Sequence, residues 1–251
     1  MRVGYNKHAC HESAHMLTAA MSTTEETWTE ENEVEDQQKP FDILKLSFGL
    51  IGSFGVLGNS IVFGVMLKSK KMRRSIPNVF IINQSFIDGL ASLILLVLPL
   101  TGQPKMPGGL AGEILCRLWQ SQWLLWGLFM TSTYNLVILT FERFLGVVYP
   151  LRHRHVVTLR GAVIAATLVW PVGLVYSLYQ VTTAVVTPEG HCQRLSNWPS
   201  EVFNRDFGIV NTFIEFLIPL AIMIACYTRM AVALQARVNP TSDEPARMVR
   251  A

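Results

Sequence analysis

Five long stretches of this sequence are almost free of charged side chains, and they restrict the chain to one kind of environment. Leu46–Leu67, Leu118–Phe141 and Gly161–Pro188 contain no Asp, Glu, Lys or Arg, whereas Pro77–Thr101 and Phe207–Thr228 contain one acid each. About 20 apolar residues of helix cross a bilayer, and a backbone in lipid must satisfy its own hydrogen bonds. The sequence therefore predicts an all-α, polytopic membrane helix bundle, with five spanning helices at about residues 43–67, 78–101, 116–144, 161–183 and 207–235.

The composition and the flanking segments agree with this prediction. Half of the residues are hydrophobic and 16% are charged, which is far from the composition of an ordinary soluble domain. Residues 1–40 contain no sustained apolar run and are acidic between Glu25 and Asp36. We therefore predict an extracellular, acidic, disordered tail over residues 1–40 and no cleaved signal peptide. The bundle is expected over residues 41–238, followed by a polar cytoplasmic segment over residues 239–251.

Basic residues gather in the first and third links between the predicted spans and after the fifth span. Five Lys or Arg lie between residues 68 and 74 and three lie between residues 152 and 160, whereas the other two links carry mixed charge. Because basic loops stay on the cytoplasmic side, we predict a multi-pass protein of the plasma membrane with its N-terminus extracellular and its C-terminus cytoplasmic. The net charge of +3 reflects this bias, so membrane lipid is an expected partner and nucleic acid is not.

The predicted topology sorts the four cysteines. Cys116 precedes the third span and Cys192 lies in the link before the fifth, so both face the oxidising exterior, where a disulfide can form and persist. A Cys116–Cys192 bridge would pin the second exterior loop to the top of the third helix. Cys226 lies within the fifth span and is expected to be a small buried apolar residue. Cys10 is also exterior and is left without an assigned role.

The segment His11-Glu12-Ser13-Ala14-His15 matches the H-E-x-x-H pattern of zinc proteases, and His8 and Cys10 lie close to it. Such a site needs both His on one helix face, the Glu beside a metal-bound water and a third ligand in a dry cleft. This segment is short and detached from any predicted core, so we expect plain tail and no metal site, with adventitious metal binding as the alternative. Because no nucleophile, base and orienting group fall together, we do not expect an enzyme.

Motifs placed along the predicted spans resemble those of the rhodopsin-like (family A) G-protein-coupled receptors, from about Leu46 to the end of the fifth span. The most distinctive are Glu142-Arg143-Phe144 at the inner end of the third span and Pro150-Leu151 in the next link. The others are Gly58-Asn59, Asn83, Asp88, Cys116, Ser132, Trp170, Cys192, Pro219 and Tyr227. The resemblance implies an extracellular ligand and, if the full-length chain exists, a heterotrimeric G protein as partners.

The resemblance also assigns roles to these residues. Asn59, Asp88 and Ser132 would line a central polar pocket with an allosteric sodium ion at Asp88, and no other cofactor is expected; hydrogen bonds that join helices are the alternative role. Arg143 would pair with Glu142 at rest and turn toward the G protein on activation, with Phe144 in place of the more usual Tyr. The coupling residues would be Glu142, Arg143, Phe144, Pro150, Leu151 and Tyr227, and the structural ones Asn83, Trp170 and Pro219.

Leu125 and Glu215 indicate which class of ligand the chain would bind. Leu125 lies eighteen residues, about 27 Å of helix, before Arg143 on the same face, at the position where biogenic-amine receptors carry an Asp, so an amine ligand is not expected. Glu215 shares a face with Asn211, and its carboxylate would bind a cationic ligand group or form an interhelical hydrogen bond. We expect a neuropeptide as the ligand. The residues predicted to line its pocket are Gln122, Leu125, Asn211 and Glu215.

Two departures from the family pattern qualify this interpretation. The interval from Cys116 to Arg143 is about two residues longer than usual, so we expect extra residues in the preceding loop or a distorted exterior end of the third helix. The family has seven spans, and the sequence to Ala251 lacks the Trp-Pro and Asn-Pro-x-x-Tyr motifs of the last two. We therefore expect a receptor fragment that ends in the third intracellular loop. The alternatives are a truncated, non-signalling isoform that associates with other receptors, and an unrelated five-span transporter or channel subunit.

Overall fold

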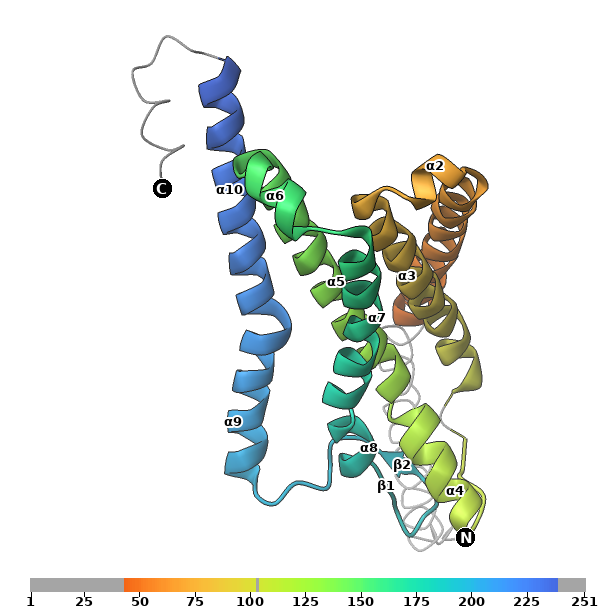
Figure 1. Ribbon diagram of the computed structural model, residues 1–251. Coiled ribbons are helices and arrows are strands. Elements are labelled where there is room, and N and C mark those ends of the chain that lie inside the picture. The colour runs from red at the N-terminus through yellow and green to blue at the C-terminus, as the bar shows by residue number, and fades with distance from the viewer. Residues whose placement is uncertain (1–42, 103, 239–251) are drawn as a thin grey trace, which may run out of the picture. The chain divides into compact units, whose positions relative to one another are not determined.

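The computed structural model describes residues 43–102 and 104–238, and five helices in this part of the chain are long and apolar enough to cross a membrane. The predicted membrane helix bundle is thus confirmed (Figure 1). The predicted tail with its His11–His15 motif and Cys10, and the segment 239–251, lie outside the described residues. From Ile51 onward the described helices form one compact unit. The five helices are Ile43–Lys68, Ile76–Thr101, Leu110–Val148, Leu159–Thr183 and Glu201–Val238.

The third and fifth spanning helices begin earlier than predicted. They start at Leu110 and Glu201, six residues before the predicted positions 116 and 207 in each case. The first turns of the fifth helix, at residues 201–206, carry mostly charged and polar side chains, which hid them from hydropathy, whereas those of the third contain one charged residue, Glu113. A local signal does mark the fifth helix: the Ser200 hydroxyl accepts a hydrogen bond from the Phe203 N–H (3.1 Å) and caps the first turn.

Both of these long helices are interrupted by a π-helical turn, and the fourth ends in a short separate helix. A π turn takes up more residues than an α turn, and such bulges are frequent at functional sites. The third spanning helix consists of α4 (Leu110–Leu115), η1 (Cys116–Gln120) and α5 (Trp123–Val148); the fourth of α7 (Leu159–Tyr176) and α8 (Tyr179–Thr183); and the fifth of α9 (Glu201–Thr212), η2 (Phe213–Leu217) and α10 (Ile218–Val238).

Helix α5 is the central element of the bundle. It packs against α3 (Ile76–Thr101), α7 and α10 (Figure 1). Between α3 and α5 the side chains of Ile87 and Leu128 are fully enclosed, and a second apolar cluster surrounds Phe80 and Ala166. Because three neighbours surround α5, its side chains can reach groups on most of the other helices.

Small residues set the closest helix crossings. A Cβ atom added at Gly173 of α7 would lie 2.8 Å from the Gly127 carbonyl oxygen of α5, and one added at Gly52 would lie 2.7 Å from Leu96 Cγ of α3. Such contacts leave no room for a larger side chain, as is common where membrane helices approach closely. The tight crossing of α5 and α7 places Trp170 and Thr131 at the same level of the bundle as the polar groups described below.

Different short elements lie at the two ends of the bundle (Figure 1). At one end, β1 (Val185–Val186) pairs antiparallel with β2 (Cys192–Gln193), and the Met106 N–H donates to the Gly190 carbonyl (2.7 Å). We call this the disulfide end. At the other end, which we call the Arg143 end, lie α2 (Lys70–Arg73) and α6 (Pro150–Val156).

Candidate functional site

The disulfide end is organised by the predicted bridge between Cys116 and Cys192, which the structure confirms with a Cα–Cα distance of 5.4 Å. Met106 and Ala184 are buried against it. The bridge therefore ties the β1–β2 hairpin to the start of the third spanning helix. Cys226 is free and buried, as predicted.

The long interval between Cys116 and Arg143 is accommodated inside the helix. The Ser121 N–H donates to the Cys116 carbonyl (2.8 Å), which closes the π turn η1, and Gln122 then adopts a left-handed backbone with φ of 62°. Of the two predicted explanations, the distorted end of the helix is therefore correct and the longer loop is wrong. Gln122 is thus the residue immediately before α5, at its N-cap position.

Loss of this bridge is expected to destabilise the protein. Cys116→Ser or Cys192→Ser opens a cross-link between positions 76 residues apart, and the free energy of unfolding should fall by about 3 kcal/mol because the unfolded chain gains freedom. Thermal unfolding in detergent measures the change, and Cys226→Ser, which removes only a free thiol, is the control. Peptide mapping without reductant that finds Cys116 and Cys192 unlinked in the native protein would contradict the assignment.

At the Arg143 end, Glu142 is held mainly by a residue that the sequence analysis did not single out. The Glu142 side chain is only 7% exposed, and its Oε1 lies 3.0 Å from His153 Nε2 of α6. Arg143 Nε is more distant, at 3.8 Å from Oε2, and its side chain is 51% exposed. The His153 ring packs at Gly146 of α5, where an added Cβ atom would lie 3.8 Å from it, in ordinary van der Waals contact. The arginine is therefore turned outward while the neighbouring acid is buried.

The other predicted coupling residues lie in α5, α6 and α10 and are exposed or partly covered. Leu151 in α6 is 74% exposed and Tyr227 in α10 is 59% exposed. Phe144 is partly covered and its ring packs edge-on against Tyr149 (5.8 Å). Exposed apolar and phenol side chains, and a half-exposed guanidinium, are each suited to contact with another protein. Pro150, also exposed, begins α6.

The Arg237 side chain links α10 to the end of α5. Its Nη2 donates to the Val147 carbonyl oxygen (2.9 Å), one of the last carbonyls of α5, which have no partner within the helix. The two residues are 90 positions apart in the sequence, so the pattern of a single helix could not have indicated this contact.

In the middle of the bundle, the structure brings two of the three predicted polar-core residues together. The Ser132 hydroxyl donates to Asp88 Oδ1 (2.7 Å). Asn59 instead donates to the Gly55 carbonyl of its own helix (2.9 Å). The other Asp88 oxygen accepts from Gln84 Nε2 (2.8 Å). The Asp88 carboxylate is thus held by donors from α3 and α5.

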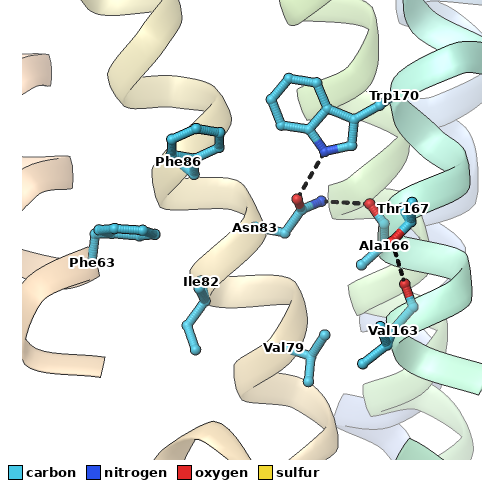
Figure 2. A pocket seen from close by; sticks show the side chains of 9 residues that line it. All are labelled: Phe63, Val79, Ile82, Asn83, Phe86, Val163, Ala166, Thr167 and Trp170. Carbon is cyan, nitrogen blue, oxygen red and sulfur yellow. Dashed lines mark hydrogen bonds between the residues drawn. The ribbon is translucent and has the colours of Figure 1, made fainter. Parts of the chain in front are cut away.

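A chain of side-chain amides extends this polar core toward α7. Asn135 Nδ2 donates to Gln84 Oε1 (2.7 Å), and Asn83 Nδ2 donates to Asn135 Oδ1 (2.9 Å). Trp170 Nε1 donates to Asn83 Oδ1 (3.0 Å), as Figure 2 shows. Sequence reasoning missed Gln84 and Asn135, although their spacing was a usable signal: Gln84 is one helical turn from Asp88, and Asn135 is one turn from Ser132.

The donor set around Asp88 does not match the expected sodium ion. Hard cations take oxygen ligands, whereas Gln84 directs N–H groups at both Asp88 and Ser132. Among the described residues, no cluster of three or more His, Cys, Asp or Glu side chains is placed to hold a metal ion.

Trp170 and Asn83 also border a lateral pocket of about 380 Å³ between the first spanning helix, α3 and α7 (Figure 2). The other side chains that line the pocket are apolar, except for the Thr167 hydroxyl. Among them, the rings of Phe63 and Phe86 stack with their centroids 5.7 Å apart. The lining contains no ionisable side chain. The pocket is therefore suited to an apolar group, and not to an ion or to acid–base chemistry.

Nearer the disulfide end, Glu215 of η2 faces a group of tyrosines. Its half-buried carboxyl interacts electrostatically with Tyr134, Tyr176 and Tyr179 from α5, α7 and α8. Tyr176 also donates to Asn211 Oδ1 (2.7 Å). The predicted pair Asn211 and Glu215 therefore points toward the bundle. The sequence analysis missed the tyrosines because they come from separate helices.

An aromatic cluster continues from this acid toward the hairpin. The Phe207 ring lies 4.9 Å from Tyr179 and 5.0 Å from Trp198, measured between ring centroids. These contacts join the start of the fifth spanning helix to the end of the fourth and to the segment after β2.

Leu125 does not take the expected place in a ligand pocket. It is 4% exposed and packs with Ile87, Ala91 and Leu128 between α3 and α5. The prediction assumed that eighteen residues of helix keep it in line with Arg143, but the close approach of α3 covers it. Gln122, three residues earlier, is only half-buried.

Comparison with known proteins places this arrangement among receptors. The family model for the seven-transmembrane receptors of the rhodopsin family matches residues 58–251. Galanin receptor type 1 of Rattus norvegicus is 24% identical over 209 residues, which cover 78% of this chain and 57% of the relative. Neuropeptide Y receptor type 1 of Xenopus laevis is 26% identical over 78% of this chain and 55% of its own. Somatostatin receptor type 5 of Bos taurus is 30% identical over a region that covers 82% of this chain and 56% of the relative. The chain thus spans little more than half the length of these relatives.

Proposed function

Since this chain belongs to the rhodopsin family of seven-transmembrane receptors, we propose that it supplies five spans of a G-protein-coupled receptor for an extracellular neuropeptide. The observation that carries this proposal is the arrangement along α5. A buried acid beside an exposed Arg143 lies at one end, and a disulfide-tied hairpin near an acidic, aromatic site lies at the other. The hairpin and Arg143 lie at opposite ends of the third spanning helix and are suited to two partners on opposite sides of a membrane.

The proposed orientation follows from the charges at the two ends. The disulfide end faces the exterior of the plasma membrane, because a disulfide persists in an oxidising compartment. The Arg143 end carries the basic residues of α2 and α6, which stay on the cytoplasmic side. The N-terminus is then extracellular and the C-terminus cytoplasmic. On this assignment, the surface around Arg143, Leu151 and Tyr227 is the one that a heterotrimeric G protein contacts.

The proposed ligand is a peptide with a basic group. The relatives of this chain include receptors for galanin, neuropeptide Y and somatostatin. In this chain, Glu215 supplies a negative charge beside three phenol rings. A carboxylate gains most from a cation where water is largely excluded, and tyrosine faces attract cations as well. Asn211 and Gln122 would contribute neutral hydrogen bonds nearby.

The experiment that tests the proposal is a signalling screen. The chain is joined after residue 251 to the last two spans of the bovine somatostatin receptor type 5 and expressed in cells with a nucleotide-exchange reporter. A panel of peptides with and without Lys or Arg is applied. We expect at least one basic peptide to drive exchange. A receptor that reaches the cell surface and responds only to molecules without a peptide bond would contradict the peptide assignment.

Within that receptor, Glu215→Gln is expected to weaken binding of the basic peptide about tenfold or more, because the substitution removes a charge from a half-buried site. Radioligand competition measures the affinity. Glu201→Gln, at the exposed start of the same helix, is the matched control and should change little. A peptide whose basic residue is replaced by a neutral one should bind both forms equally. An equal loss for the charged and the neutral peptide would show that Glu215 does not contact the cation.

A further inference from the structure

Gln84 lies at the centre of the polar core, with both ends of its amide in use. Its Nε2 donates to Asp88 Oδ2 and to the Ser132 hydroxyl oxygen, and its Oε1 accepts from Asn135 Nδ2. With the bond from Ser132 to Oδ1, each carboxylate oxygen of Asp88 already accepts a hydrogen bond. The amide N–H groups of Gln84 thus point at Asp88 Oδ2 and Ser132 Oγ, two oxygens that a cation at this carboxylate would use as ligands.

The direction of the Gln84 amide follows from groups whose hydrogen-bonding role is fixed. An amide can be built in either of two orientations, and its neighbours decide between them. The Trp170 indole can only donate, so it requires Asn83 Oδ1; the Ala166 carbonyl can only accept, so it requires Asn83 Nδ2 (3.1 Å). These two contacts are drawn in Figure 2.

The neighbours of Asn135 and Gln84 orient these two amides in the same way. The Phe80 carbonyl can only accept, so Asn135 must present Nδ2 to it (3.0 Å), and Asn135 Oδ1 then receives Asn83 Nδ2. Asn135 Nδ2 also faces Gln84, which must therefore present Oε1 to it. If the Gln84 amide turned over to offer oxygen to a cation, two N–H donors would face each other at Asn135, which is fully buried.

From this geometry we propose that Gln84 takes the place of a sodium ion at Asp88. It is a positioning residue: its N–H groups satisfy the carboxylate, and the amide chain that begins at Trp170 holds it in that direction. The stability of this protein then does not depend on sodium. The inference concerns the polar core alone and depends on neither the peptide ligand nor G-protein coupling.

The test compares thermal unfolding of the whole chain in lipid nanodiscs in sodium chloride and in choline chloride, each at about 150 mM so that ionic screening is equal. The native protein should unfold at the same temperature in both salts, within about 1 °C. Gln84→Met should unfold at a lower temperature in choline, and sodium should raise its Tm by about 3 °C, because Asp88 has lost one donor and is open to a cation. Adding Asp88→Asn to that variant should abolish the sodium effect.

Asn135→Leu is the second variant, for use if Gln84→Met does not fold. It leaves Gln84 and Asp88 in place but removes the donor that orients the Gln84 amide, so sodium should raise its Tm as well. A sodium-specific rise in Tm of the native protein would overturn the proposal. The proposal also fails if neither variant acquires a sodium response, because Gln84 is then not what excludes the ion.

Discussion

Arg143→Ala is expected to reduce ligand-driven nucleotide exchange to the level seen without ligand, in a receptor completed with two further spans. The Arg143 side chain is half exposed at its end of α5, and the nearest acid is already held by His153 at 3.0 Å. Its guanidinium is therefore available to the partner. Ligand affinity should change by less than about threefold, because Arg143 does not belong to the proposed ligand site and lies nine residues, about 13 Å of helix, from Tyr134 of that site.

The matched control for this prediction is Arg154→Ala. Arg154 is also an exposed arginine at the Arg143 end, but it lies in α6 and has no ion pair with Glu142 among the residues described. Exchange assays with purified G protein and competition binding on the same membranes give the two quantities. If Arg143→Ala kept full exchange while Arg154→Ala lost it, the arginine needed for coupling would be Arg154, and the proposed role of Arg143 would be wrong.

The main features of the fold could be predicted because they depend on one requirement, the long apolar helix. Each long apolar stretch forms a spanning helix, and Cys116 and Cys192 form the predicted disulfide. The π turns η1 and η2 were not predictable from hydropathy, since a π turn and an α turn bury similar residues. Only the long interval from Cys116 to Arg143 indicated that the helix was distorted.

The candidate sites were predicted less completely, because they depend on contacts between helices. His153 reaches Glu142 only because α6 begins directly after α5 and turns back along it. Asn59 matches the family motif, yet it bonds to its own helix at Gly55. Leu125 has the expected spacing but is covered by α3. Residue type and spacing along one helix cannot show what a second helix places opposite.

The last prediction concerns the 251-residue chain on its own. Purified in nanodiscs with a G protein, it is expected to give no ligand-dependent nucleotide exchange above that of empty nanodiscs. The described helices supply the α5, α6 and α10 sides of the surface around Arg143, and α5, α7 and η2 supply the walls around Glu215. A ligand enclosed on these sides alone can dissociate laterally. In the 251-residue chain its binding energy also cannot shift the conformational equilibrium of the two further helices, because this chain does not contain them.

Joining the chain to two further spans should restore exchange, and this comparison separates folding from function. Thermal unfolding and the Cys116–Cys192 bridge report whether the shorter chain is folded, and they should be similar in both forms. The polar core from Trp170 to Asp88 lies wholly within the described helices, so its hydrogen bonds should survive in the shorter chain. Robust ligand-driven exchange from the 251-residue chain would mean that α5, α6 and α10 form a sufficient coupling surface, and that the two further spans are not needed for signalling.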